Sequence, residues 1–438
     1  MFRTFATCTL GCKVNQYETD AMEQMLLRAG YEKVDFKEMA DIYLINTCSV
    51  TNMADKKSRQ MIHRAKKKNP NSIVVAAGCY IQAQADQKAE LDEHIDLIIG
   101  NNKKKDIVTI LEQYYRDNLL EETVIDINHT NEYEELSIDT VNEHTRAYLK
   151  IQDGCNQFCS YCIIPYVRGR IRSRRPENVI QEVKTLVSNG YKEVVLTGIH
   201  LSSYGKDLEQ GSLIDLIEEI NRIDGLERIR LGSLEPRIIT EEFAERLAKV
   251  DKICPHFHLS LQSGCDETLK RMNRHYSIEE YEHSLALLRK VFHEPALTTD
   301  VIVGFAGETE EEFAETVEAL KRMNLYEMHI FKYSVRKGTR AEKMPNQVPE
   351  QKKTERSNVL LAMAKLHKET YEKQWLGQEE EILAEEFVEI QGQKYLTGHT
   401  KRYVKIAVRT EENLIGQIVK VKIEKYLDKE VLAAEILH

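Results

Sequence analysis

Three cysteines lie close together in one short segment of the chain. Cys155, Cys159 and Cys162 stand in the sequence DGCNQFCSYCIIP. Thiolates at this spacing are typical ligands of an iron–sulfur cluster or of zinc. A structural zinc site normally needs four ligands, and no fourth Cys or His follows these three at a short interval. The segment therefore favours a cubane cluster that leaves one iron open to a cofactor, with zinc as the alternative.

Three further cysteines are far apart in the sequence, but each follows a predicted strand. They are Cys12, Cys48 and Cys79, which follow strands predicted over residues 2–7, 42–46 and 73–77. The carboxyl ends of parallel strands lie at one edge of a sheet, where ligands bind. We therefore expect these thiols to converge in a second metal site. The alternatives are three separately packed core cysteines, or Cys8 in place of Cys12.

The elements that position these thiols alternate between strand and helix patterns. The first 130 residues read as a doubly wound α/β domain, with a fourth strand over residues 95–99 and helices over 15–29 and 55–69. An acidic, patternless stretch, residues 134–143, is interpreted as a linker. A second strand–helix series occupies residues 141–373. Its strands are predicted over residues 148–151, 193–196, 228–231, 257–261, 299–303 and 328–333.

Six strands with intervening helices predict a partial (β/α)6 barrel, whose functional groups should lie at the carboxyl ends of the strands. A long helix over residues 352–373 leads away from it. Residues 374–438 contain short alternating runs typical of about five strands in a small all-β barrel. The fold class is therefore α/β with a C-terminal all-β domain.

Two groups of basic residues are candidates for RNA binding. In the C-terminal segment Lys401, Arg402 and Tyr403 place cations beside an aromatic ring, a combination suited to phosphate contact and base stacking, although a solvated hairpin has the same pattern. A second run follows the cysteine loop and is suited to RNA phosphate, although alternation must turn some of its members away. It consists of Arg168, Arg170, Arg172, Arg174 and Arg175.

The composition limits the class of protein further. The chain has 438 residues, 42% of them hydrophobic and 30% charged, and its formal net charge is −10. These values exclude a disordered or collagen-like chain. The longest apolar runs fall short of the ~18 residues of a membrane span, and no secretory signal is evident. We therefore expect a cytoplasmic protein with reduced thiols, among which Cys254 and Cys265 are structural.

The cysteine loop, with Tyr161 before its last cysteine, resembles that of the radical S-adenosylmethionine enzymes. The whole chain resembles the methylthiotransferases of that superfamily. This resemblance rests on GCKVNQYETD, INTCSVT, AAGCY, GCNQFCSYCIIPYVRGRIRSR, LSLQSG and DVIVGFAGETEEEF. It implies two 4Fe–4S clusters. Cys155, Cys159 and Cys162 would hold the cluster that cleaves S-adenosylmethionine, and Cys12, Cys48 and Cys79 an auxiliary one. The terminal barrel resembles the TRAM domain, which engages tRNA.

The resemblance and the predicted strand ends also suggest cofactor contacts. Seven residues are expected to face the S-adenosylmethionine site, namely Tyr161, Thr197, Gly198, Ser260, Gln262, Arg274 and Asp300. For Tyr161 a core aromatic role, and for Arg274 a surface ion pair, are the alternatives. No catalytic side chain is expected beyond the cluster ligands. The reaction that the resemblance implies replaces the hydrogen at C2 of an adenine in tRNA. That C–H bond is too weakly acidic for a side-chain base, whereas a carbon radical can take its hydrogen atom.

GCKVNQYETD and CSYCIIPYVRGRIRSR resemble the branch that acts on N6-threonylcarbamoyladenosine at position 37 of tRNA, next to the anticodon. The alternatives within the family are isopentenyladenosine-37 and a ribosomal-protein aspartate. A different class of protein, a zinc-stabilised RNA-binding protein without enzymatic activity, is the distant alternative. The chemistry implied by the resemblance also requires an electron donor of the flavodoxin or ferredoxin type and a source of sulfur.

Overall fold

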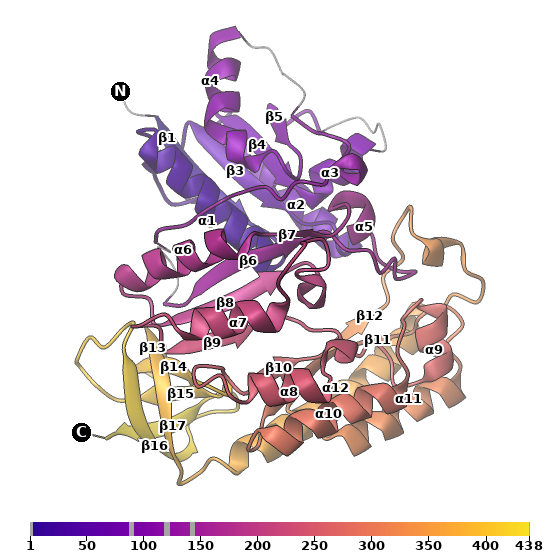
Figure 1. The fold of residues 1–438 in the computed structure, drawn as a ribbon. Coiled ribbons are helices and arrows are strands. Elements are labelled where there is room, and N and C mark those ends of the chain that lie inside the picture. Colours follow the sequence, from indigo (N-terminus) through magenta and orange to yellow (C-terminus); the bar gives the residue numbers. More distant parts are fainter. Residues whose placement is uncertain (1–2, 87–91, 118–122, 141–144, 438) are drawn as a thin grey trace.

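A computed structural model describes residues 3–86, 92–117, 123–140 and 145–437. The chain forms an N-terminal α/β domain, a central open barrel and a C-terminal closed barrel (Figure 1). The N-terminal domain lies above β6 to β9 of the central barrel in this view, and the C-terminal barrel lies at the lower left, where Arg228 and Arg230 of β9 contact it. Among the described residues, no helix is long and apolar enough to cross a membrane.

The N-terminal domain contains a parallel sheet of five strands in the order β2–β1–β3–β4–β5. The strands are β1 (Thr4–Thr9), β2 (Glu32–Lys33), β3 (Ile42–Thr47), β4 (Ile73–Gly78) and β5 (Leu97–Ile99). Helices α1 (Lys13–Arg28) and α4 (Ile107–Asp117) pack on one face, and α2 (Asn52–Lys68) and α3 (Cys79–Asp86) on the other. Every residue of β3 is buried, as expected for a central strand covered on both faces.

The central barrel is an open, curved sheet of six parallel strands. They are β6 (Ala147–Asp153), β8 (Glu193–Gly198), β9 (Arg228–Leu231), β10 (His256–His258), β11 (Ala296–Val303) and β12 (Glu327–Lys332). Isolated parallel bridges, Ile229 to Ile253 and Leu234 to Leu259, join β9 to the β10 side. The short strand β7 (Arg172–Ser173) pairs antiparallel with β6.

Helices cover the outside of this sheet and share one apolar core with it. They are α6 (Pro176–Ser188), α7 (Leu213–Asn221), α8 (Glu241–Leu247), α10 (Ile278–Val291) and α11 (Glu310–Met323). Helix α9 (Asp266–Arg271) follows β10, and helix α12 (Glu350–Lys373) packs along β12. The closed barrel has the strand order β13–β14–β15–β17–β16. Its strands are β13 (Glu379–Ile390), β14 (Gln393–Thr400), β15 (Lys405–Val408), β16 (Ile418–Tyr426) and β17 (Leu432–Ile436).

The predicted fold class is confirmed. All ten α/β strands that we predicted are present, nine of them with shifted ends, and the terminal barrel has five strands. The strands β2 and β7 were not predicted, because two residues carry no periodicity that a sequence pattern could reveal.

Candidate metal centres

The first cysteine triad lies in the loop that follows β6. Gly154 begins this loop with φ +70°, a conformation that favours glycine, and a Cβ there would lie 1.7 Å from the carbonyl oxygen of Arg170. Backbone bonds fix the loop on both sides, since Cys155 N donates to Gly169 O at 3.0 Å and Cys162 N to Cys159 O at 3.0 Å. The close return of the chain therefore holds the three thiols near the end of one strand.

Buried surroundings and one guanidinium characterise this first site. Burial raises the pKa of the Cys155 thiol to about 11 and also raises that of Cys162, with the neighbouring Cys159 adding to both shifts. Arg274 Nη1 donates to Cys159 Sγ at 3.3 Å. A raised pKa favours the neutral thiol, so these cysteines become thiolates only with positive charge beside them, which Arg274 supplies in part and a bound metal would complete.

The second triad assembles at the carboxyl edge of the N-terminal sheet. Cys12 follows β1, Cys48 follows β3 and Cys79 follows β4. Gly11 allows close packing, since a Cβ on it would lie 2.9 Å from Cys48 Cβ and 3.0 Å from Cys48 Sγ. The three thiols influence one another electrostatically. The structure therefore brings these distant cysteines together, whereas Cys8 lies within β1 and packs beside the core on the α2 side.

The two triads are neighbours. Cys79 packs in one apolar cluster with Ala83, Ile163 and Val167, of which Ile163 directly follows the last cysteine of the first triad. Helix α5 (Ile164–Val167) thus connects the first cysteine loop to the ligands of the second. The N-terminal domain and the barrel therefore present their thiols at one shared junction.

A buried network of charges supports the second triad. Arg168 Nε donates to Cys79 Sγ at 3.2 Å, and its Nη atoms bind Glu18 at 2.5 and 3.0 Å. Two lysines also bind Glu18, Lys104 at 3.1 Å and Lys150 at 2.8 Å. Burial alone would raise the pKa of Glu18, but these three cations hold it well below its usual range.

This network carries more positive than negative charge. Asp153 pairs with Lys150 at 2.6 Å and with Arg172 at 3.7 Å, so four buried cations face the two carboxylates of Glu18 and Asp153. Isolated charges are costly to bury unless they are paired. An excess of buried cations beside the Cys79 sulfur is therefore compatible with an anionic, thiolate-ligated group.

The thiols of neither triad are gathered as closely as a single zinc ion would hold them. Zinc bound by thiolates at about 2.3 Å in a tetrahedron requires sulfur atoms about 3.8 Å apart. Among the described residues, groups of three ligand atoms that all lie within 4.8 Å are His63, Asp92 and His94, and His258, Asp300 and His329. Neither cysteine triad is among them. The wider spacing fits a cubane, in which each sulfur binds a different iron.

The residues predicted to face S-adenosylmethionine lie near the carboxyl ends of the barrel strands, but their contact with the cofactor stays a prediction. Thr197 and Gly198 end β8, and Asp300 lies on β11. Gln262, with φ +73°, forms a bridge to Val301, and Ser260 O accepts a bond from Arg274 Nη2 at 3.3 Å. Tyr161 lies edge-on to Phe305 at a centroid distance of 6.2 Å.

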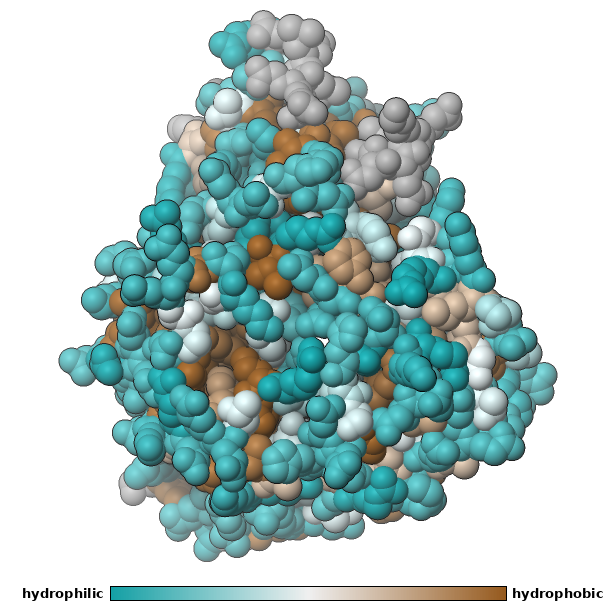
Figure 2. All heavy atoms as spheres, turned by 45° about the vertical axis from the view of Figure 1, so that its right-hand side comes forward, coloured by the Kyte–Doolittle hydropathy of each residue, from teal (hydrophilic) through white to brown (hydrophobic). Residues whose placement is uncertain are grey.

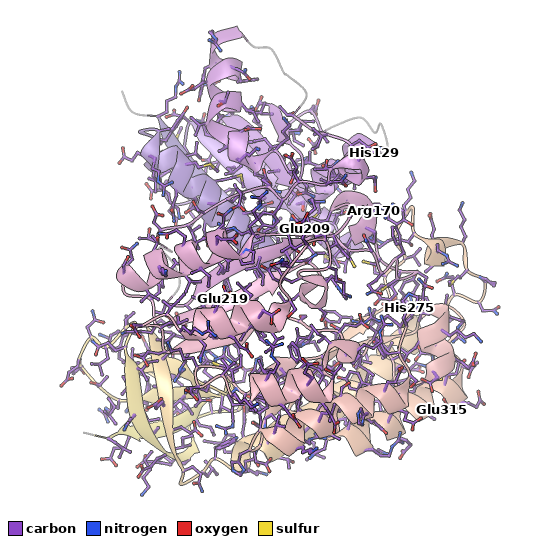
Figure 3. The ribbon with its side chains drawn as sticks, in the orientation of Figure 1. His129, Arg170, Glu209, Glu219, His275 and Glu315 are labelled. Atoms are coloured by element: carbon purple, nitrogen blue, oxygen red, sulfur yellow. The ribbon has the colours of Figure 1, made fainter. Side chains whose placement is uncertain are left out.

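The arginine run after the cysteine loop is mostly internal. The side chains of Arg168 and Arg172 are 0% exposed and that of Arg174 is 3% exposed, the last pairing with Glu182. The predicted RNA contact is wrong for these three arginines, because a buried guanidinium cannot reach a phosphate. Arg170 lies half-buried over the Phe158 ring, where the N-terminal domain meets the barrel (Figure 3). Arg175 is exposed, so for Arg170 and Arg175 the RNA contact stays a prediction.

The C-terminal candidates contribute to the contact between the two barrels. Tyr403 lies 4.3 Å from the His399 ring and 5.2 Å from the His256 ring, and its hydroxyl accepts a bond from Arg146 Nη1 at 3.0 Å. Tyr403 thus contacts rings within the protein while it stays half-buried, and its RNA contact stays a prediction.

Arg402 is also engaged within the protein. It donates to the carbonyl oxygens of Glu294 and His293 at 3.1 and 3.0 Å, and it pairs with Glu380 at 3.2 Å. These partners hold the guanidinium, which remains partly exposed, and its phosphate contact stays a prediction. Lys401 is half-buried and has no such partner among the described residues, so its prediction stands.

Sequence reasoning missed the residues that stabilise the second site. These residues come from three different elements: Glu18 from α1, Lys104 from the turn before α4, and Lys150 from β6. The one signal in the sequence that could have indicated them was the charged end, KIQD, of the strand predicted there. Lys13 was also missed as a site residue. It follows Cys12, is exposed, and lies 5.8 Å from the Tyr148 ring centroid. Desolvation by the surrounding protein, with repulsion from Arg230 and Arg146, lowers the pKa of Lys13 to about 8.

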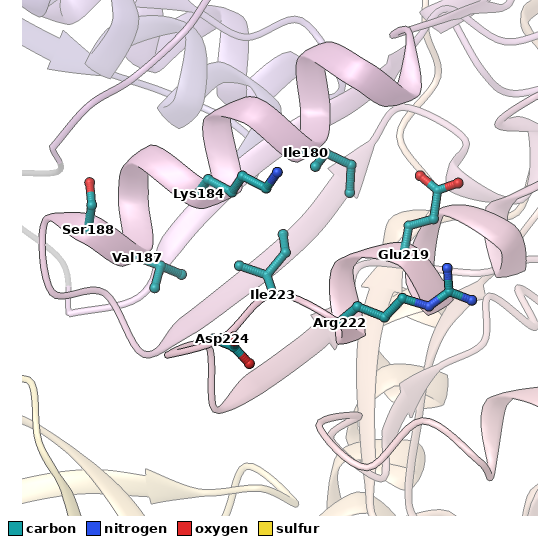
Figure 4. A pocket seen from close by; sticks show the side chains of 8 residues that line it. All are labelled: Ile180, Lys184, Val187, Ser188, Glu219, Arg222, Ile223 and Asp224. Carbon is teal, nitrogen blue, oxygen red and sulfur yellow. The ribbon is translucent and has the colours of Figure 1, made fainter.

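A groove on the outer surface lies away from these centres. It runs between α6 and the end of α7, and neither triad contributes to it (Figure 4). Its lining residues are Ile180, Lys184, Val187, Ser188, Glu219, Arg222, Ile223 and Asp224. The chemistry is therefore expected at the junction of the triads.

An open six-stranded barrel with a three-cysteine loop after its first strand defines a radical S-adenosylmethionine protein. Residues 149–320 match the Radical SAM superfamily, and residues 4–100 match the uncharacterized protein family UPF0004. The fold resembles that of the radical S-adenosylmethionine methyltransferase TsrM from Kitasatospora setae, with a TM-score of 0.55 and 16% identity over 75% of this chain and 73% of that one.

Full-length relatives define the family. The chain is 44% identical to the threonylcarbamoyladenosine tRNA methylthiotransferase MtaB of Bacillus subtilis, over 96% of this chain and 94% of the relative. It is 38% identical to a tRNA-2-methylthio-N(6)-dimethylallyladenosine synthase of Clostridium botulinum, over 95% and 93%. The chain therefore belongs to the radical S-adenosylmethionine methylthiotransferases, enzymes that use S-adenosylmethionine and two 4Fe–4S clusters.

Proposed function

We propose that this enzyme transfers a methylthio group to C2 of N6-threonylcarbamoyladenosine at position 37 of tRNA. The observation that carries the proposal is the near full-length similarity to MtaB proteins, at 44% identity for Bacillus subtilis and 42% for Aquifex aeolicus. The dimethylallyladenosine synthases reach 38%. Since both groups are similar to this chain, the modified nucleoside must be argued from the site as well.

A lysine that directly follows the Cys12 ligand in the chain favours the threonylcarbamoyl substrate. Lys13 is exposed next to Cys12, and no carboxylate of the described residues forms an ion pair with it. The threonyl group carries a carboxylate, whereas a dimethylallyl group is uncharged. Lys13 is thus placed to pair with the group that distinguishes the two nucleosides. A charge-assisted hydrogen bond of this kind contributes about 1.5–3 kcal/mol.

The two triads divide the chemistry between them. Cys155, Cys159 and Cys162 would hold the cluster that binds S-adenosylmethionine, and Cys12, Cys48 and Cys79 the auxiliary one. When bound, the first cluster and its cofactor supply a carbon radical able to take an unactivated hydrogen atom. Arg274 orients Cys159, and Arg168 orients Cys79 through hydrogen bonds to sulfur. The residues between the triads would hold the base so that C2 faces both centres.

The reaction needs two partners that supply electrons and sulfur. We infer a one-electron donor of the flavodoxin or ferredoxin type, because reductive cleavage of S-adenosylmethionine consumes an electron. A separate sulfur source must replace the sulfur that leaves with the product.

Reconstituted enzyme and two tRNA substrates test the proposal. One tRNA carries N6-threonylcarbamoyladenosine and the other N6-isopentenyladenosine, and mass spectrometry of the nucleosides identifies the product. We expect 2-methylthio-N6-threonylcarbamoyladenosine alone; methylthiolation of only the isopentenyl nucleoside would contradict the assignment. Lys13→Gln should lower kcat/KM for the first tRNA roughly 10- to 150-fold. The control Lys37→Gln, at an exposed lysine of the same domain, should leave it unchanged.

A further inference from the structure

The first part of helix α2 carries exposed cations beside the second triad. The helix begins four residues after Cys48, and Lys56, Lys57 and Arg59 are all exposed on it. Within the described part of the chain, none of the three forms an ion pair. The acidic residue of this turn, Asp55, does not neutralise them, because it pairs with Arg336 at 2.7 Å. Three positive charges thus stay open to solvent.

A loop after β12 connects α2 to the first triad. We call residues 336–343 the bridge loop. At one end, Arg336 Nη2 donates to Ser49 Oγ at 2.8 Å, next to the second-triad ligand Cys48. Further along, Ala341 N donates to Ser160 O at 2.7 Å, between two ligands of the first triad. The bridge loop therefore spans the junction at which both centres meet.

The bridge loop adds three cations to those of α2. Lys337, Arg340 and Lys343 are exposed, and no ion pair involves them among the residues that the structure describes. Exposed cations in this protein commonly pair, as Lys332 does with Glu350 at 2.5 Å just before the loop. Six unpaired cations on two adjoining elements are notable in a chain whose net charge is −10.

We propose that these six residues form a basic rim that binds the phosphates of the RNA strand on either side of the target nucleotide. The rim consists of Lys56, Lys57, Arg59, Lys337, Arg340 and Lys343. This inference rests on the proposed function and adds to it the surface that grips the tRNA. Phosphate contacts fix the position of a nucleic acid without reading its sequence, which is what a base entering between two centres requires.

The rim fits RNA better than an acidic protein partner. Its residues lie on α2, which begins four residues after Cys48, and on the bridge loop, which bonds to Ser49 and Ser160 beside ligands of the two triads, so a strand held there places a nucleotide at the junction. Val50 and Met53, which are 52% and 58% exposed, lie beside the α2 cations and offer apolar contact for a ribose or base. The face of the molecule seen in Figure 2 is mostly hydrophilic, and its most evident apolar patch lies in a hollow at the lower left of the view.

RNA binding by the cluster-loaded protein tests the rim. Fluorescence anisotropy with an unmodified tRNA anticodon stem–loop is measured over a series of salt concentrations. One variant carries Lys337→Gln, Arg340→Gln and Lys343→Gln, and a second carries Lys56→Gln, Lys57→Gln and Arg59→Gln. Each lost phosphate contact lowers the salt slope by about 0.7, so each variant should lose about 2 from the slope and bind roughly fifty-fold more weakly near 0.15 M salt.

A matched control removes the same charge elsewhere. Lys184→Gln, Lys249→Gln and Lys290→Gln change three exposed lysines on the outside of the barrel and should leave the slope unchanged. Rim variants that fold, load iron and bind RNA within about twofold of this control would overturn the inference. The inference would also be overturned if the rim variants bound RNA normally but their clusters were no longer reduced by a flavodoxin-type donor, because the rim would then be a protein docking site. The product formed by the unmodified enzyme tests the proposed function separately.

Discussion

Replacing Glu18 by glutamine should destabilise the contact between the N-terminal domain and the barrel. The Glu18 carboxylate lies on α1 and accepts bonds from Arg168 and Lys150 of the barrel and from Lys104 of its own domain. All four side chains are 0% exposed. Glutamine keeps the volume but removes the negative charge, so three buried cations lose a shared partner.

The size of the effect follows from the burial. Removing one member of a buried ion pair costs about 3–5 kcal/mol, because the remaining charge is left uncompensated. With an m value of about 2 kcal/mol per molar urea for a domain of this size, the unfolding midpoint should fall by about 1.5–2.5 M. Asp153 remains as a partner for Lys150, so the lower half of that range is expected.

Pulse proteolysis of the cluster-loaded protein in urea measures this midpoint, with the N-terminal domain identified by the fragments. The exposed residue Glu38 provides the control, and Glu38→Gln should change the free energy of unfolding by no more than about 0.5 kcal/mol. If Glu18→Gln behaves like the control, the buried network does not stabilise the domain contact and our interpretation of it fails.

Three further predictions concern charge, backbone and sulfur. Burial alone would raise the pKa of Glu193, but Arg230 and Arg146 hold it at about 2, below its ordinary 4.5. The ionised Glu193 should contribute about 3 kcal/mol to the free energy of unfolding above pH 4.5, and this contribution should be lost as the pH falls toward 2. Glu193→Gln should therefore flatten the acid limb of a plot of the free energy of unfolding against pH. A limb as steep as in the unmodified enzyme would contradict this. Gly154→Ala should reduce the iron bound by the first triad, because the added Cβ has no room beside the Arg170 carbonyl oxygen. Iron analysis measures this loss, with Gly190→Ala as the control, since Gly190 also has a positive φ but open space around it. Equal losses of iron in both variants would refute the prediction. Arg168→Lys keeps the charge but removes the hydrogen bond from Nε to Cys79 Sγ, so the reduction potential of the auxiliary cluster should fall in an EPR-monitored redox titration. The control Arg175→Lys should leave the potential unchanged. An unchanged potential in Arg168→Lys would show that this hydrogen bond does not tune the cluster.

The fold and the six thiols could be predicted because their signals are local. Apolar runs such as residues 73–77 mark buried parallel strands, and the rule that strand ends meet at one edge brings Cys12, Cys48 and Cys79 together without any distance information. The first triad needs even less, since its members lie within one loop.

The roles of the charged residues could not be predicted, because their partners are distant in the sequence. Arg168 and Glu18 are 150 positions apart, and only the packed domains reveal that they form an ion pair. An alternating arginine run has the same pattern whether it faces solvent or a buried carboxylate. Tyr403 likewise contacts His256 and Arg146 because the closed barrel packs against the open one, which the sequence does not reveal. Conversely, the cations of α2 have the same sequence pattern as an ordinary solvated helix face, so the pattern alone does not single them out.

The division of work between the two triads is tested most directly by one comparison. A variant with Cys12, Cys48 and Cys79 all changed to alanine is reconstituted without oxygen beside the unmodified enzyme, and iron, 5′-deoxyadenosine and modified nucleoside are measured together. We predict about eight irons per chain for the unmodified enzyme and about four for the variant. The variant should still cleave S-adenosylmethionine but form no methylthiolated nucleoside. A variant that keeps all the iron and modifies tRNA at the normal rate would contradict the account.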